Sequence, residues 1–156
     1  MVGHIRQTLD KEDFKHIPIM SYAVKYASAL YGPFRQVTEG SPILGDRRTH
    51  QMNFANGNEA LREAALDIEE GADILMVKPG HAYLDILYRV KQAYPFMPLA
   101  VYHTSGEYSM IKAAAERNWI DEKQTALEIM TAFRRAGADI ILTYHAKSVA
   151  RWLNED

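Results

Sequence analysis

Short apolar runs alternate with longer amphipathic segments along the whole chain. Four runs have the length and composition of buried parallel strands, and Gly, Pro or Asp bounds them: residues 17–20, 73–77, 99–102 and 139–144. Between and around these runs, apolar residues recur at helical spacing, which predicts helices over residues 3–9, 59–70, 83–93, 107–117, 121–136 and 146–154. Strands that alternate with helices indicate an α/β fold with a parallel sheet and right-handed crossovers.

Two nearly identical strings support repeated β/α units. Residues 70–75 read EGADIL and residues 136–141 read AGADII, so each marks a helix end, a tight turn and a strand start. About four units can be counted, whereas a closed (β/α)8 barrel needs eight strands and about 250 residues. We therefore expect residues 1–156 to form a single domain that is either a small open sheet or half of a barrel.

Residues 31–58 show no clear helix or strand pattern. The segment contains the turn signals Gly32-Pro33, Gly40-Ser41-Pro42 and Asn56-Gly57, together with aromatic and arginine residues. A loop of this length in a compact domain is usually functional or disordered. The aromatic and arginine residues favour the functional interpretation, in which this segment is a lid that covers a binding site.

Composition narrows the class of protein further. The formal net charge of −2 gives no electrostatic reason to expect nucleic acid or an anionic membrane as a partner. The chain has no cysteine, which excludes disulfides and thiolate metal ligands within it. No apolar stretch approaches the roughly 20 residues of a membrane span, and the first residues lack a signal-peptide pattern. We expect a cytoplasmic protein.

Lys78 ends the second apolar run and is followed by Pro79 and Gly80. Burial of an ammonium group is costly unless the pKa of the amine falls, and a lysine with a lowered pKa attacks carbonyl groups to form Schiff bases. The alternative is a lysine that extends from the strand end into water. Polar side chains at the other strand ends would meet Lys78 at the same edge of the sheet: Lys25, Ser105 and Tyr144. A second amine would lower the pKa of Lys78 further, which favours imine chemistry.

Each of the neighbouring residues also has a purely structural interpretation. Lys25 could lie on the surface of a short helix over residues 23–29, Ser105 could be a helix N-cap, and Tyr144 could pack in the core. The arginines of the 31–58 segment could bind a carboxylate or remain solvated: Arg35, Arg47 and Arg48. The six histidines show no metal-ligand spacing, and no nucleotide-binding glycine motif is present.

Six motifs in the same order resemble the C-terminal half of the porphobilinogen synthase family, also called δ-aminolevulinic acid dehydratase. They are MSYAVK at 20–25, YGPFR at 31–35, GDRR at 45–48, MVKPG at 76–80, YHTSGE at 102–107 and AFRRAGAD at 132–139. The resemblance runs the whole length of the chain. It implies a partial (β/α)8 TIM barrel of about four C-terminal β-α units.

The resemblance also implies a reaction, in which two 5-aminolevulinate molecules condense to porphobilinogen with loss of two waters in tetrapyrrole and heme biosynthesis. Lys78 matches the lysine that forms a Schiff base with the first substrate, and Lys25 matches the lysine that forms an imine with the second. Ser105 and Tyr144 match groups that hold the carboxylate of the first substrate. Arg35, Arg47 and Gln51 match groups near the carboxylate of the second substrate.

Metals and partners follow from the resemblance as well. Glu63 matches a glutamate that ligates a regulatory Mg²⁺ in many bacterial members; the alternative is a solvated acid on a helix face. The ligands of a catalytic Zn²⁺ or Mg²⁺ would lie outside this chain, and the full-length family forms a homo-octamer. Because the family's subunit is about twice as long, we expect this chain to need the other half for activity.

Two alternatives remain open at this point. Another Schiff-base enzyme, such as an aldolase, would share Lys78 but would not require the second lysine or the arginine-rich segment. An inactive half-barrel could instead pair with itself through its edge strands as a structural module.

Overall fold

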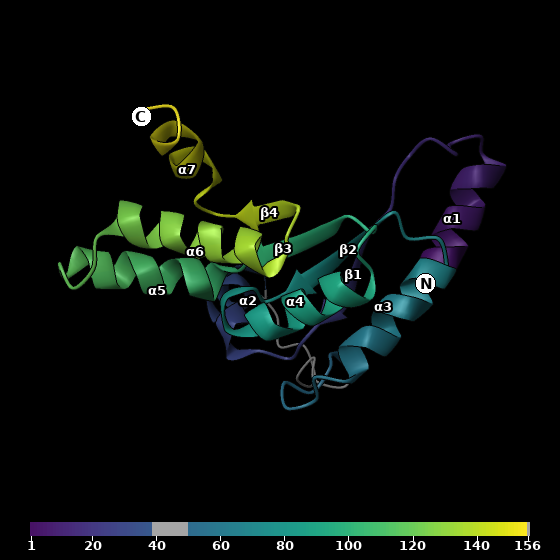
Figure 1. The fold of residues 1–156 in the computed structure, drawn as a ribbon, viewed down its shortest axis with the longest axis horizontal. Helices are drawn as coiled ribbons and strands as arrows, with labels where there is room; N and C mark the ends of the chain where they lie inside the picture. The colour runs from purple at the N-terminus through teal and green to yellow at the C-terminus, as the bar shows by residue number, and fades with distance from the viewer. Residues whose placement is uncertain (39–49, 156) are drawn as a thin grey trace.

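The computed structural model describes residues 1–38 and 50–155, so Arg47 and Arg48 lie outside the described residues. Within the described residues, four parallel strands form one sheet in chain order: β1 (Met20–Lys25), β2 (Ile74–Lys78), β3 (Leu99–His103) and β4 (Ile140–Thr143). The four arrows lie side by side in Figure 1. The predicted α/β class, with four parallel β/α units of a barrel, is confirmed.

Helices connect and flank the strands. They are α1 (Val2–Lys11), η1 (Ala29–Tyr31), α2 (Gly32–Thr38), α3 (Glu59–Glu69), η3 (His81–Tyr83), α4 (Leu84–Ala93), α5 (Ser105–Glu116), α6 (Glu122–Ala136) and α7 (Ala146–Trp152). Figure 1 places α1 at one end of the molecule and α7 at the other, with α5 and α6 side by side. Leu75, Leu87 and Phe133 are fully buried between sheet and helices. No helix within the described ranges is long and apolar enough to cross a membrane.

The first strand and the segment after it differ from the prediction. β1 begins at Met20, so residues 17–20 are not the strand, and the alternative helix over 23–29 is wrong because β1 includes residues 23–25. The strand was missed because Ser21, Tyr22 and Lys25 interrupt its apolar residues, so the segment does not form an apolar run. The predicted 31–58 lid contains α2, whose Pro33 sits in the first turn, where a missing N–H breaks no helical hydrogen bond.

β1 carries a bulge against β2. Met20 and Ser21 pair with Ile74 and Leu75, whereas Val24 and Lys25 pair with Val77 and Lys78. The pairing thus advances three residues on β1 while it advances two on β2, which leaves one extra residue on β1. After the bulge, Lys25 lies directly beside Lys78.

The repeated strings have the same structural role in both copies. Gly71 and Gly137 adopt positive φ angles of 93° and 110° at the ends of α3 and α6, a conformation that glycine tolerates best. Asp73 Oδ2 then accepts a hydrogen bond from the Ile19 backbone N–H at 2.7 Å, and Asp139 Oδ2 accepts one from Leu99 N–H at 2.9 Å. Each aspartate therefore ties the start of its own strand to the start of the preceding neighbour in the sheet.

Candidate active site

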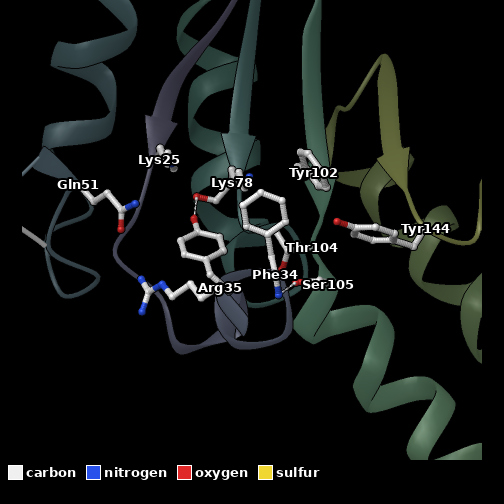
Figure 2. Close-up of a pocket in the computed structure, with 10 residues that line it drawn as sticks. Lys25, Phe34, Arg35, Gln51, Lys78, Tyr102, Thr104, Ser105 and Tyr144 are labelled. Carbon is white, nitrogen blue, oxygen red and sulfur yellow. Dashed lines mark hydrogen bonds between the residues drawn. The ribbon is translucent and has the colours of Figure 1, made fainter. Parts of the chain in front are cut away.

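A pocket lies at the carboxyl ends of the strands, with about 420 Å³ of space that no atom fills, part of it open to solvent. Its lining residues come from the ends of β1, β2 and β3 and from the segments that follow the strands, including the residue after β4: Lys25, Tyr31, Phe34, Arg35, Gln51, Lys78, Tyr102, Thr104, Ser105 and Tyr144. Figure 2 shows Lys25, Lys78 and Tyr102 at the ends of three neighbouring strands, with Tyr144 after the fourth. Six residues singled out from the sequence thus meet in one pocket: Lys25, Lys78, Arg35, Gln51, Ser105 and Tyr144.

Lys78 lies half-buried among aromatic rings. Its Nζ is 4.3 Å from the ring centroid of Tyr102, 5.1 Å from that of Tyr22 and 5.3 Å from that of Tyr31. Burial, and after it the nearby Lys25 ammonium, lower the pKa of Lys78 to about 8, while the Glu107 carboxylate partly opposes them. The ring faces attract an ammonium group, so they moderate this decrease rather than cause it. The amine is therefore much closer to its neutral, nucleophilic form than an ordinary lysine.

Lys25 is the direct neighbour of Lys78 across the β1–β2 pairing. The Tyr22 ring faces both amines, since its centroid is 5.9 Å from Lys25 Nζ and 5.1 Å from Lys78 Nζ. Two ammonium groups this close repel each other, which favours loss of a proton from one of them. Two amines of this kind on one face suit a site that forms imines with carbonyl substrates.

Tyr31 fixes the backbone beneath the two lysines. Its hydroxyl donates to the Tyr26 carbonyl at 2.8 Å and lies 3.2 Å from the Lys78 carbonyl. Burial raises the pKa of the Tyr31 phenol far above its ordinary range, so this hydroxyl stays protonated as a donor. Sequence reasoning did not assign Tyr31 or Tyr102 to the site, although both lie within the motifs that carry the resemblance.

Hydroxyl groups line the side of the pocket near β3 and β4. Thr104 is the N-cap of α5, so the alternative that Ser105 is the N-cap is wrong. Ser105 is the first residue of the helix, and its Oγ accepts a hydrogen bond from the Phe34 N–H at 3.2 Å. Tyr144 is 48% exposed, so the alternative of a core tyrosine is wrong as well. Burial and the neighbouring Tyr144 hydroxyl raise the pKa of Tyr102 to about 12.

Arg35 and Gln51 border the pocket on the β1 side. The Arg35 guanidinium carbon lies 5.8 Å from the Tyr31 ring centroid. Gln51 Oε1 is buried and has no hydrogen-bond partner among the residues that the structure describes. A cationic fork and an unsatisfied amide oxygen are groups that a polar ligand can engage.

Glu63 lies outside this pocket, on α3. Its side chain is 35% exposed and pairs with Arg62 at 3.0 Å. Within residues 1–38 and 50–155, no group of three or more His, Asp or Glu side chains is arranged to hold a metal ion. A single carboxylate paired with an arginine does not make a complete ligand set, so a metal at Glu63 stays a prediction.

The fold and the site together define a class of protein, the β/α barrels with lysines at their active site. The parallel β/α units give the fold, and the two strand-end lysines among aromatic rings give the site. A family model described as Delta-aminolevulinic acid dehydratase matches residues 1–152, and the chain belongs to that family. Relatives of that name from Synechocystis and Bacillus subtilis are 58% and 59% identical over 99% and 97% of this chain.

A solved structure gives the same assignment. It is delta-aminolevulinic acid dehydratase (porphobilinogen synthase) from Toxoplasma gondii in complex with the reaction product porphobilinogen. It matches 99% of this chain with a TM-score of 0.94 and 48% identity, and the match covers 44% of that chain. The chain likewise spans about half the length of the curated relatives, 47% and 46% for the two named above.

Proposed function

We propose that this chain supplies the Schiff-base site of a porphobilinogen synthase, which condenses two 5-aminolevulinate molecules to porphobilinogen and two waters. The observation that carries the proposal is the pair Lys25 and Lys78, side by side at the carboxyl ends of neighbouring parallel strands in one pocket. Because the chain spans about half of its relatives, we propose the full activity for the site completed by the remaining half.

Lys78 captures the first substrate. Its neutral Nζ adds to the ketone carbon of 5-aminolevulinate, and loss of one water from the resulting carbinolamine leaves a C=N bond. With a pKa of about 8, roughly a tenth of the Lys78 amine is neutral at pH 7, against about 0.03% for an ordinary lysine with a pKa of 10.5. Burial and the neighbouring Lys25 charge together thus raise the concentration of the reactive form about 300-fold.

Lys25 captures the second substrate in the same way. Two imines on adjacent strands hold their substrate carbons close together, so the bond-forming steps between them become intramolecular. This arrangement favours a two-substrate condensation over an aldolase, which needs one lysine.

Side chains at the two sides of the pocket suit the substrate carboxylates. The Ser105 and Tyr144 hydroxyls, near β3 and β4, would donate to the carboxylate of the first substrate. Arg35 and Gln51, near β1, would bind the second, with a bidentate contact from the guanidinium. Arg47 is proposed for the same role and lies outside the described residues.

Several features of the whole protein stay proposals. They are a lid over residues 31–58, a regulatory Mg²⁺ at Glu63, a catalytic Zn²⁺ or Mg²⁺ with ligands elsewhere, a homo-octamer and a cytoplasmic location. The described residues do not supply a complete ligand set for a metal ion.

Reductive trapping tests the proposal. The chain is incubated with 5-aminolevulinate and borohydride, and the modified peptide is located by mass spectrometry, with the exposed Lys147→Met variant as a control. We expect 5-aminolevulinate to form an adduct on Lys78. A simple aldehyde, which an aldolase-like site would accept, should form a much weaker adduct. Absence of an adduct in a chain shown to be folded would favour the structural half-barrel instead.

A further inference from the structure

The Glu107 carboxylate is buried between the two turns that follow β2 and β3, with 2% of the residue exposed. It accepts hydrogen bonds from the Thr104 N–H at 2.5 Å and the Thr104 hydroxyl at 2.7 Å. It also accepts from the Gly80 N–H at 3.1 Å and from the His81 N–H. One side chain therefore joins segments that are 27 residues apart in the sequence.

Helix capping explains only one of these four contacts, the bond from the Thr104 N–H. A capping box at the start of α5 requires the reciprocal bonds between Glu107 and Thr104. The bonds to Gly80 and His81 lie outside that motif, and these two residues belong to the turn that directly follows Lys78 and Pro79. The carboxylate thus holds the turn that ends the lysine-bearing strand.

The turn is also tightly enclosed at Gly80. A Cβ atom at Gly80 would lie 2.7 Å from Phe133 Cζ and 2.9 Å from Val101 Cγ2, so a larger residue has no space there. On the other side, the Tyr31 hydroxyl lies within hydrogen-bonding distance of the Lys78 carbonyl. The backbone on both sides of Pro79 is therefore fixed, and Glu107 is the charged group that fixes it.

We propose that Glu107 is a positioning residue for Lys78: its carboxylate holds the turn over residues 78–81 through two backbone N–H groups, and its negative charge partly offsets the repulsion between Lys78 and Lys25. The inference rests on the proposed Schiff-base function and adds to it a residue that does not touch the substrate.

The electrostatic part follows from the groups that face Lys78. Lys25 and Tyr22 face it from β1, Tyr31 from η1, Tyr102 from β3, and the Glu107 charge acts from α5. Glu107 raises the pKa of Lys78, in the direction opposite to burial and Lys25. Without the carboxylate, the amine would lose its proton at lower pH but would sit on a turn that is no longer held.

The first test measures Lys78 without any substrate. Competitive acetylation of the full chain over a range of pH, followed by peptide mass mapping, gives the midpoint at which Lys78 becomes reactive. In Glu107→Gln we expect this midpoint to fall by on the order of half a pH unit, because a negative charge is removed. Glu116→Gln removes the same charge from the exposed far end of α5 and should leave the midpoint unchanged.

The second test separates positioning from charge. At pH 10, where most of Lys78 is neutral in both proteins, we expect trapping of 5-aminolevulinate to be several-fold slower in Glu107→Gln than in the unaltered chain, because the Gln amide group cannot accept from all four donors. Glu107→Asp keeps the charge on a shorter side chain, so it should slow trapping while the acetylation midpoint stays within about 0.2 of the original.

The outcomes distinguish the two proposals. If the unaltered chain forms no adduct, the Schiff-base function fails, whatever the acetylation midpoints show. If the adduct forms but the Glu107→Gln midpoint and trapping rate match those of the unaltered chain, the role of Glu107 is overturned. If Glu107→Gln does not fold, two other measurements test the role of Glu107. One is the trapping rate of Glu107→Asp, and the other is amide hydrogen exchange in the unaltered chain. The Gly80 and His81 amides should be strongly protected from exchange, and rapid exchange at both would overturn the inference.

Discussion

Replacement of Lys25 by Met should make Lys78 a weaker nucleophile at neutral pH without removing its ability to form an imine. Lys25 is the paired neighbour of Lys78 across β1 and β2, and its charge is the second-largest cause of the lowered pKa of Lys78. Methionine has nearly the same length and no charge, so the substitution removes the repulsion and keeps most of the packing. Lys25→Arg is the matched control, because it keeps the charge but cannot form an imine.

The size of the effect follows from the order of the causes. The pKa of Lys78 falls from 10.5 to about 8, a decrease of about 2.5, and burial is the largest cause. Burial persists in Lys25→Met, so we expect the pKa to rise by less than half of this decrease, about one unit. The neutral fraction at pH 7 then falls from roughly 10% to about 1%, and capture of 5-aminolevulinate should slow about tenfold.

Trapping rates measured from pH 6 to pH 10.5 test this reasoning. The rate profile of Lys25→Met should move to higher pH by about one unit and meet the original profile at the alkaline end, whereas that of Lys25→Arg should not move. In the completed enzyme both variants should lose porphobilinogen formation. An unshifted profile in Lys25→Met would refute the electrostatic coupling, and loss of capture at every pH would show that Lys25 is needed for binding the first substrate.

Three further predictions concern capture and stability. Lys78→Met should abolish the 5-aminolevulinate adduct in peptide mapping, and an adduct that persists on another lysine would contradict the assigned roles. Gly106→Ala should lower the free energy of unfolding by about 1–3 kcal/mol in urea titrations, because its Cβ would lie 2.3 Å from the Leu30 carbonyl oxygen; an unchanged midpoint would disprove that close approach. Burial lowers the pKa of His103 to about 4, whereas the same side chain in the unfolded chain has a pKa of 6.5. As the pH decreases from 6.5 to 4, the unfolded chain therefore binds a proton that the folded chain does not, and the free energy of unfolding should fall by up to about 3 kcal/mol. The slope should weaken in His103→Asn, and an equal slope in both proteins would exclude His103 as its source.

Apolar runs predicted β2, β3 and β4 to within one residue at each end, because the three strands are short, apolar and bounded by turns. β1 was placed wrongly because its polar residues do not mark its exposed face: Ser21 is buried, whereas Tyr22 is 46% exposed, so no apolar run signals the strand. The helix α2 was missed because Gly32-Pro33 was interpreted as a turn, although proline is also favoured at a helix start.

At the site, residues that are marked by their neighbours in the sequence could be predicted, whereas residues whose partners are distant in the sequence could not. Lys78 could be singled out from its own neighbours in the sequence, since an amine after an apolar run is unusual. The role of Glu107 could not, because its partners Gly80 and His81 are 27 and 26 residues away and its local motif indicates only a capped helix. The pairing of Lys25 with Lys78 likewise depends on strand register, which no segment of the sequence specifies alone.

The bulge in β1 explains how one short strand contacts two different layers. In an unbroken strand, residues four apart point to the same face, so Ser21 and Lys25 would both face either the helices or the pocket. Ser21 donates a hydrogen bond to Asp67 on α3, whereas Lys25 lines the pocket. The extra residue between Ser21 and Val24 changes the parity of the strand and allows both contacts. Alternation counted from Ser21 would therefore place Lys25 on the wrong side of the sheet. In a homologous sequence, too, the lysine would be assigned to the wrong face if the bulge were ignored.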